Sequence, residues 1–413
     1  MQNLKFVMNY QTHILKNGLR LIHQKTDRQV AYCAIIINTG TRDELKNEHG
    51  LAHFLEHLVF KGTSKRKAYH IVSRMEDVGG EIDAYTTKEE TCIYASFLSK
   101  YYDRTIELMS DMIFNSVYPE KEINKERDVV LDEINSYFDS PAELIFDDFE
   151  ELVFDGHSLG RNILGTKKTL KKFNSDNLKQ FSLRTHNTDQ IVLCSVGNIE
   201  FNKLVKSFKK YFNNVPENKR KWKRPPFKNY IPQEKTVFKK THQAHCIIGT
   251  TAYNFRNKKQ LPFLLLTNLL GGSGLNSRLN LSLREKNGLV YNVETSYTPY
   301  FDTGIFSIYF GCDKDKLNKS LLLIKKEIEK IKNIPLGKKQ LQRAKQQMLG
   351  QIAISLENPE NLLLGLGKSF LLFNKVDSIE TVTNKLMKIT SDDILKVANE
   401  TFKDNKFSTL IYK

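Results

Sequence analysis

The chain has 413 residues, of which 40% are hydrophobic and 27% charged, and its formal net charge is +16 at pH 7. This composition is typical of a folded protein with a substantial core, and the length predicts two or more domains. No stretch approaches the roughly 20 consecutive apolar residues of a membrane helix, and the N-terminus lacks the pattern of an export signal or organellar presequence. We therefore expect a cytoplasmic protein with no membrane partner.

Lysine supplies most of the positive charge, with a local concentration in ENKRKWKRPPFK, residues 217–228. No helix-turn-helix, zinc-finger or RNP-type pattern accompanies it, so a solvated lysine-rich surface is predicted and no nucleic-acid partner is expected. A basic nucleic-acid-binding protein stays a remote alternative. The five cysteines are far apart and form no CxxC pair, which indicates buried free thiols in a reducing compartment.

The first strong element along the chain is AYCAIIINTG, residues 31–40, a continuous apolar run that predicts a buried strand. The next is HGLAHFLEHLVFKGT, residues 49–63, which predicts a helix over 49–61. His53 and His57 then lie one turn apart on one face, so both imidazoles can bind one metal ion. Glu56 lies on nearly the same face and can reach a water held by the metal.

These three residues suit peptide hydrolysis by a zinc enzyme. Zinc lowers the pKa of a bound water to near 7, and a neighbouring carboxylate can move its proton to the leaving amine. HxxEH is the reverse of HExxH and occurs in zinc peptidases. The alternative is an amphipathic helix with polar residues at its border, but burying His, Glu and His without a common partner would be costly.

Further along, EIDAYTTKEETCIYASFL, residues 81–98, predicts strands, and residues 101–117 have helical spacing. KEINKERDVVLDEINSYFDS, residues 121–140, predicts another helix that can supply a third metal ligand. Glu126 and Glu133 are seven residues apart, two turns along one face, and Glu133 interrupts a run of apolar positions. A carboxylate here would complete a His2Glu site.

Four prolines fall within residues 214–235, a stretch without helical or strand periodicity that predicts a linker. The segments on either side resemble each other at an offset of about 212 residues: AYCAIIINTGTRDE aligns with AHCIIGTTAYNFRN, and DAYTTKEETCIYASFL with TSYTPYFDTGIFSIYF. A duplicated α+β unit follows. We expect an N-terminal catalytic domain at 1–213 and a C-terminal domain at 236–413, each an antiparallel-rich sheet with helices packed on one face.

GLAHFLEHLVFKGT, GGEIDAYTTKEETCIYA and KERDVVLDEI, with the spacing from Glu56 to Glu133, resemble the pitrilysin-type M16 zinc metallopeptidases. The most similar subfamily is that of the mitochondrial processing peptidase and its bacterial single-gene relatives. The resemblance implies that His53, His57 and Glu133 bind one zinc ion per chain and that Glu56 is the general base. It also implies that Glu126 helps to hold the ligands, although an ordinary surface glutamate would fit the same position.

The resemblance extends to substrate binding. Residues 81–91 match the edge strand on which the family lays an extended peptide, so backbone contacts from Ala84, Tyr85 and Thr86 are expected, although plain strand residues would look the same. LLGGSGLNSRLNLSLREKNGLVYNVETSY, residues 269–297, resembles the glycine-rich loop and the Arg–Tyr pair that holds substrate, here Arg284 and Tyr291. A structural ion pair is the alternative for Arg284.

The second half lacks the metal residues, because Leu265, Asn268 and Leu269 occupy the matching positions. The resemblance therefore implies a clamshell of two homologous domains in which one does chemistry and both enclose unfolded peptide substrates. It implies a homodimer, with a heterodimer containing an inactive M16 paralogue as the alternative. A non-catalytic structural M16 subunit is the main alternative function, and the complete set of zinc residues argues against it.

Overall fold

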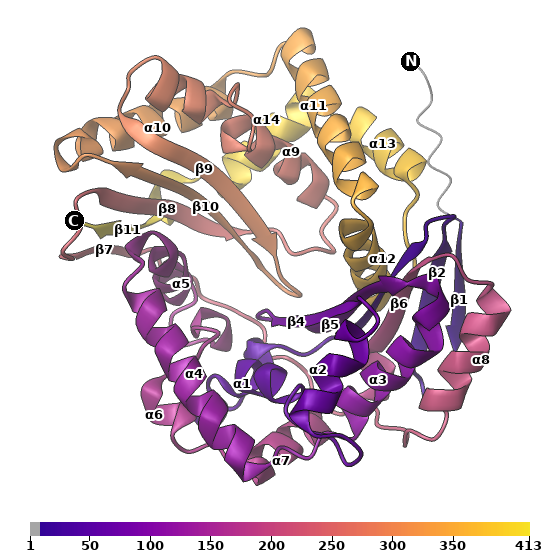
Figure 1. Ribbon diagram of the computed structural model, residues 1–413. Coiled ribbons are helices and arrows are strands. Elements are labelled where there is room, and N and C mark those ends of the chain that lie inside the picture. The colour runs from indigo at the N-terminus through magenta and orange to yellow at the C-terminus, as the bar shows by residue number, and fades with distance from the viewer. Residues whose placement is uncertain (1–8) are drawn as a thin grey trace. The chain divides into compact units, whose positions relative to one another are not determined.

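The computed structural model describes residues 9–413, which form two compact units. Each unit contains one sheet covered by helices, as expected for two M16-type α+β domains (Figure 1). The first unit contains residues up to 134, 163–224 and 353–380, and the second contains 135–162, 225–352 and 381–413. The units therefore differ from the expected contiguous domains, because each takes a segment from the other half of the chain.

The first unit is built on a six-stranded sheet in the order β1-β2-β6-β3-β5-β4. All neighbours are antiparallel except β2 and β6, so the sheet is antiparallel-rich as predicted. The side chains of β3 (Val30–Ile37) point alternately into two cores, with Cys33 and Ile35 on one face and Ala34 and Ile36 on the other. This explains its continuous apolar sequence. The strands are β1 (Tyr10–Ile14), β2 (Arg20–Lys25), β3 (Val30–Ile37), β4 (Glu81–Thr86), β5 (Thr91–Leu98) and β6 (Ile191–Gly197).

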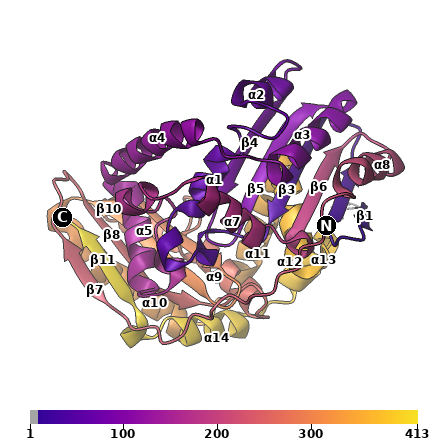
Figure 2. The same ribbon diagram turned by 90° about the horizontal axis from the view of Figure 1, so that it is seen from below.

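Most helices of the first unit share the larger core on one face of this sheet (Figure 2). The opposite face, which the sequence left uncovered, packs against a single helix, α12 (Pro359–Phe373), through Leu363, Leu366 and Phe370. That face is apolar and must also be buried. The other helices are α1 (Leu51–Leu58), α2 (Ala68–Glu76), α3 (Tyr102–Phe114), α4 (Glu120–Phe138), α6 (Lys167–Leu170), α7 (Ser175–Thr185) and α8 (Phe201–Phe212).

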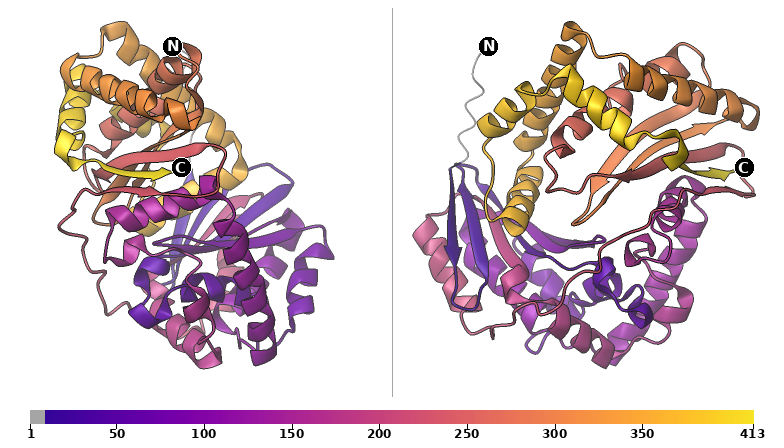
Figure 3. Two further views of the ribbon diagram at one scale, coloured as in Figure 1. Left: turned by 90° about the vertical axis from the view of Figure 1, so that its left-hand side faces the viewer. Right: turned by 180° about the vertical axis from the view of Figure 1, so that it is seen from behind.

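The second unit repeats this plan with a five-stranded sheet in the order β7-β11-β8-β10-β9. Figure 3 shows orange and yellow helices of the second half of the chain beside this sheet. Its single parallel pair, β7 with β11, corresponds to β2 with β6. The duplication inferred from the sequence is therefore visible strand by strand. The strands are β7 (Glu234–Val237), β8 (Ala244–Ala252), β9 (Val290–Pro299), β10 (Gly304–Cys312) and β11 (Ser408–Tyr412).

Helices also cover both faces of the second sheet. The larger core lies between one face and α9, α10 and α14, while α5 (Pro141–Val153) packs on β8 and β11 at the other. Among residues 9–413, no helix is both long enough and apolar enough to cross a bilayer. The remaining helices are α9 (Gln260–Gly271), α10 (Leu317–Asn333), α11 (Lys338–Glu357), α13 (Ile379–Met387) and α14 (Ser391–Thr401).

Candidate metal centre

The HxxEH residues lie on α1, a short helix in the core of the first unit. Leu51, Phe54 and Leu58 are fully buried against the sheet and fix one face of the helix. The helix begins after Gly50, whose φ of 91° lies in the left-handed region that favours glycine. A Cβ at Gly50 would also lie 2.6 Å from the Cα of Gly165, so the start of the helix is sterically defined.

A buried carboxylate caps α1. Oε2 of Glu44 accepts a hydrogen bond from the Gly50 N–H at 3.0 Å, and Oε1 accepts one from the Ala52 N–H at 2.9 Å. A negative charge at this end of a helix is favourable because the first N–H groups lack partners within the helix. Glu44 lies six residues before Gly50, the residue that precedes α1, and was not predicted from the sequence.

Three predicted metal ligands converge. Nε2 of His53 and Nε2 of His57 lie 3.8 and 3.7 Å from Oε2 of Glu133. One donor atom from each of the three residues lies within 4.8 Å of the others. Tetrahedral zinc with ligands near 2.1 Å requires donor atoms about 3.4 Å apart, so small shifts of the side chains would suffice.

Glu126 orients His57. Its Oε2 lies 3.2 Å from Nδ1 of His57, and its Oε1 forms an ion pair with Nζ of Lys61 at 2.7 Å. Glu126 is only 7% exposed, which rules out the ordinary surface glutamate considered above. With Nδ1–H donating to this carboxylate, the Nε2 lone pair of His57 is left to face Glu133 and a metal ion.

The other histidine is prepared differently. Burial, followed by the influence of His57, lowers the pKa of His53 to about 3, so the imidazole is neutral and able to bind a metal. Its Nδ1 is buried and has no hydrogen-bond partner among residues 9–413, so its tautomer is not set by a protein acceptor. The donor set, two imidazoles and one carboxylate, fits zinc.

Glu56 is half-buried beside the ligands on α1. Burial is the main cause that raises the pKa of its carboxyl, and Glu133 and Asp83 raise it further, while Thr86 and His57 act in the opposite direction. A carboxyl with a raised pKa accepts and returns a proton more readily near neutral pH.

The predicted peptide-binding strand, β4, is the outer strand of the first sheet and lies beside α1. The N–H of Ala84 points away from β5 and donates to Oδ1 of its neighbour Asp83 at 2.8 Å. The hydroxyl of Tyr85 donates to Oε1 of Glu90 at 3.0 Å. Thr86 lies at the end of the strand closest to Glu56. The structure therefore brings Thr86 to the metal centre and occupies the side-chain hydroxyl of Tyr85 elsewhere.

Arg284 and Tyr291 belong to the second unit, and their part in substrate binding stays a prediction. Both side chains are exposed, Arg284 on a π-helical turn and Tyr291 at the start of β9. The Tyr291 hydroxyl donates to Oδ1 of Asp313 at 2.7 Å. Arg284 makes no side-chain ion pair within residues 9–413, which does not support the structural ion pair considered for it.

The second unit has no counterpart of the metal centre, as the aligned sequences predicted. Leu265 is buried in the core and can offer no ligand. Asn268 of α9, aligned with Glu56, donates to Oε1 of Gln351 on α11 at 3.0 Å. A neutral amide pair thus joins two helices at the place where the first unit gathers charged ligands.

Comparisons with known proteins agree with this assignment of the two halves. Residues 20–167 match the family described as insulinase, peptidase family M16, and residues 172–348 match the one described as peptidase M16 inactive domain. A Bacillus subtilis protein called uncharacterized zinc protease YmxG is 32% identical over 398 residues, which is 96% of each chain.

More distant relatives cover similar lengths. The beta subunit of the mitochondrial-processing peptidase from Saccharomyces cerevisiae is 30% identical over 94% of this chain and 87% of that protein. A solved structure of a protease from Helicobacter pylori superposes with a TM-score of 0.89 over 98% of this chain and 99% of that one, at 23% identity. The last comparison supports the fold alone.

Proposed function

Because the chain belongs to the M16 peptidase family, we propose that it is a zinc-dependent endopeptidase that hydrolyses unfolded or extended peptide segments. The observation that carries this proposal is the convergence of His53, His57 and Glu133, one donor atom from each, within 4.8 Å. A zinc ion held there would supply a Lewis acid and a water of lowered pKa.

The remaining work falls to the chain's own residues. Glu56, whose pKa is raised by burial, takes a proton from the attacking water and passes it to the leaving amine. Glu126 keeps the His57 ring in the orientation that presents Nε2. Glu56 thus transfers the proton, Glu126 orients a ligand, and Glu133 serves as the third ligand.

Substrate binding is proposed to follow the edge of the first sheet. An extended peptide can add a strand to β4, where backbone hydrogen bonds give affinity without demanding a particular sequence. Arg284 and Tyr291 would contact the same peptide from the second unit. The proposal also includes one zinc per chain and a homodimer, with pairing to an inactive M16 paralogue as the alternative assembly.

The decisive experiment compares wild type with Glu56→Gln on an unstructured, internally quenched peptide, with zinc measured in both proteins. We expect activity in the wild type, a loss of at least about 1,000-fold in the variant, and the same zinc content in both. Zinc-loaded wild type that cleaves no peptide would instead favour the non-catalytic M16 subunit. Equal activity in both proteins would remove Glu56 from its role.

A further inference from the structure

The basic segment 218–224 is not a free surface loop. It runs extended without joining a sheet, and its residues alternate strictly in exposure: Lys219, Lys221 and Lys223 are exposed, while the residues between them are partly buried. The guanidinium of Arg220 stacks on Trp222 at 4.3 Å. The sequence predicted that all the basic side chains of this segment face solvent. In the structure the lysines do so, whereas the arginines are partly buried against the first unit.

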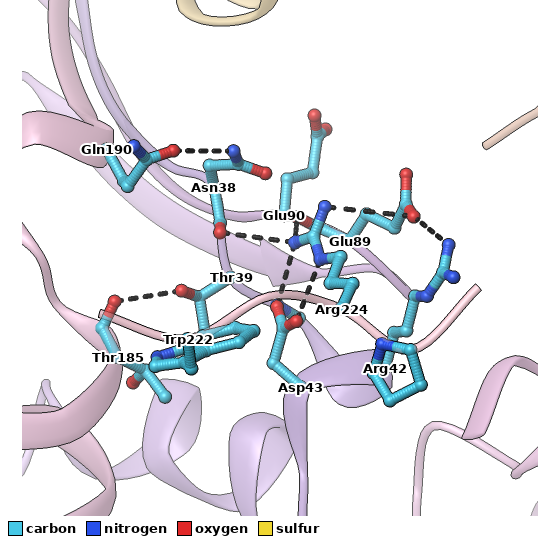
Figure 4. A network of polar contacts seen from close by, with 12 residues as sticks. Asn38, Thr39, Arg42, Asp43, Glu89, Glu90, Thr185, Gln190, Trp222 and Arg224 are labelled. Carbon is cyan, nitrogen blue, oxygen red and sulfur yellow. Dashed lines mark hydrogen bonds and ion pairs between the residues drawn. The ribbon is translucent and has the colours of Figure 1, made fainter. Parts of the chain in front are cut away.

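Arg224 ends the segment 163–224 of the first unit, and its side chain is buried, at 4% exposure. Its Nε and Nη2 each lie 2.8 Å from one oxygen of the Asp43 carboxylate, whose side chain is fully buried (Figure 4). Two parallel charge-assisted bonds fix both the distance and the angle between the partners. The two side chains of such a buried pair therefore have one defined position relative to each other.

Asp43 leads directly to the metal helix. The next residue is Glu44, whose carboxylate accepts the N–H groups of Gly50 and Ala52 at the start of α1. Asp43 also accepts the N–H of Gly40 at 3.0 Å, so the turn that carries both acids is closed on itself. The position of Arg224 is thus transmitted through two adjacent residues to the helix of His53 and His57.

The same guanidinium holds the turn that follows the edge strand. Nη2 of Arg224 donates to the carbonyl oxygen of Glu89 at 2.9 Å, and the side chain of Glu89 pairs with Arg42 at 2.6 Å (Figure 4). Backbone bonds reinforce this connection, since the N–H of Arg42 donates to the carbonyl of Lys88 at 2.8 Å. One side chain therefore contacts both the support of α1 and the turn that ends β4.

We propose that Arg224 is a positioning residue that fixes the metal helix α1 relative to the peptide-binding strand β4. The proposal rests on the proposed peptidase function for its catalytic consequence. The contacts to Asp43 and Glu89 lie in the first unit alone, so the effect on α1 and β4 requires no motion of the second unit. A lysine could not replace it, because one ammonium cannot contact both carboxylate oxygens in the plane of a fork and reach the Glu89 carbonyl.

The test compares Arg224→Met and Arg224→Lys with the same two substitutions at Arg20, all in the full chain. Arg20 is a matched control because it is buried in the same unit and bonds to Asn374 and to the carbonyls of Phe370 and Leu371 at the end of α12. Three quantities are measured: zinc affinity by chelator competition, hydrogen–deuterium exchange of segments 44–58 and 81–90, and kcat with KM on the unstructured peptide. Lys223→Met removes an exposed charge from the neighbouring position and controls for changes in the segment 218–224 that do not involve the Arg224 contacts.

At position 224 the methionine variant is expected to bind zinc about 10-fold to 100-fold more weakly. Exchange in both segments is expected to rise, and kcat to fall more than KM changes. Arg224→Lys should lie between this variant and wild type, and it carries the test if the methionine variant does not fold. The Arg20 variants should lower the melting temperature without changing zinc affinity or the exchange of the two segments by more than about twofold.

Zinc affinity and exchange at Arg224 variants equal to those of the matched Arg20 variants would overturn the proposal. So would exchange that rises in only one of the two segments, because the inference requires that one side chain support both. A wild type without peptidase activity would refute the proposed function alone, since zinc affinity and exchange would still report whether Arg224 positions the helix and the strand.

Discussion

At the scale of single residues, His57 is held between two carboxylates of one helix. Its Nδ1 contacts Glu126 at 3.2 Å, and its Nε2 lies 3.7 Å from Glu133, both on α4. The imidazole is therefore oriented before any ion arrives. An aligned ring loses less entropy on binding a metal than a ring that rotates freely, which is the usual benefit of such outer partners.

Neutralising Glu126 tests this orientation. Glu126→Gln keeps the shape of the side chain but replaces a charged acceptor, so we expect zinc affinity to fall about 10-fold while the fold is retained. Chelator competition measures the change. Asp128→Asn, an exposed isosteric change on the same helix, should bind zinc like wild type. Unchanged affinity in Glu126→Gln would show that the carboxylate does not prepare His57.

The residues of the site differ in how far the sequence could predict them. His53 and His57 follow from helical geometry, because four residues make about one turn. Glu133 and Glu126 are brought to them by the packing of α4. Helical spacing made both residues candidates for the third ligand, and only the resemblance to the family separated their roles. Glu44 and Arg224 were missed, because a cap six residues away and a buried arginine 181 positions from its partner leave no local pattern.

At the scale of elements, the outer edge of β4 is partly occupied by its own chain. The N–H of Ala84 donates to the Asp83 carboxylate, so an incoming peptide must replace this bond. Asp83→Ala should therefore lower KM about 3-fold to 10-fold for a peptide without Lys or Arg. The change in kcat should be smaller than the change in KM, because Asp83 is the least of the influences on the pKa of Glu56. A neutral peptide removes any attraction between its charges and Asp83. A raised KM would mean that Asp83 itself contacts the substrate.

Close packing of strand and helix in the second unit leads to another prediction. A Cβ at Gly249 on β8 would lie 2.1 Å from the carbonyl oxygen of Phe306 and 2.9 Å from the ring of Phe149 on α5. Because a backbone atom cannot move aside cheaply, Gly249→Ala should destabilise the unit by about 1–3 kcal/mol.

The matched control is Gly350→Ala on α11, where a Cβ would meet no atom within 4 Å. Alanine in an open helical position is expected to stabilise by about 0.5–1 kcal/mol. Denaturant unfolding followed by circular dichroism measures both changes. If the two variants shift the free energy of unfolding in the same direction, the close approach of β8 to its neighbours does not exclude a side chain at position 249.

The sequence predicted whether a segment is a helix or a strand more successfully than it predicted which other segments it contacts. The strands expected within 81–98 are Glu81–Thr86 and Thr91–Leu98, and the helix expected at 101–117 is Tyr102–Phe114. The segment 218–224 was predicted to lack helical and strand periodicity, and it forms neither a helix nor a strand, but its exposure alternates with period two, which was not predicted. The alternation escaped notice because arginines, and not apolar residues, occupy the inward positions, and their burial depends on acids far away in the sequence.

At the scale of the whole molecule, the duplicated halves exchange one helix each. α5 follows α4 in the first half and covers the sheet of the second, whereas α12 follows α11 in the second half and covers the sheet of the first. The hydrophobic pattern of a helix predicts that it must be buried, but not against which sheet. This is why the expected boundaries 1–213 and 236–413 do not coincide with the compact units.

The exchange predicts that neither half folds fully alone. A fragment of residues 1–224 would expose the apolar face of β2, β3, β5 and β6 that α12 normally covers. We expect it to aggregate or to bind a hydrophobic dye, and to recover a defined complex when co-expressed with residues 225–413. Size-exclusion chromatography and dye fluorescence measure both states.

Two substitutions in the co-expressed second fragment make this test specific. Leu366→Asp places a charge on the face of α12 that is buried against the first sheet and should abolish recovery. Gly365→Asp is its control, because this neighbouring position is exposed and open. A fragment 1–224 that is monomeric, binds no dye and unfolds cooperatively would contradict the prediction. The first sheet would then be stable with one face uncovered, and α12 would serve a purpose other than completing that core.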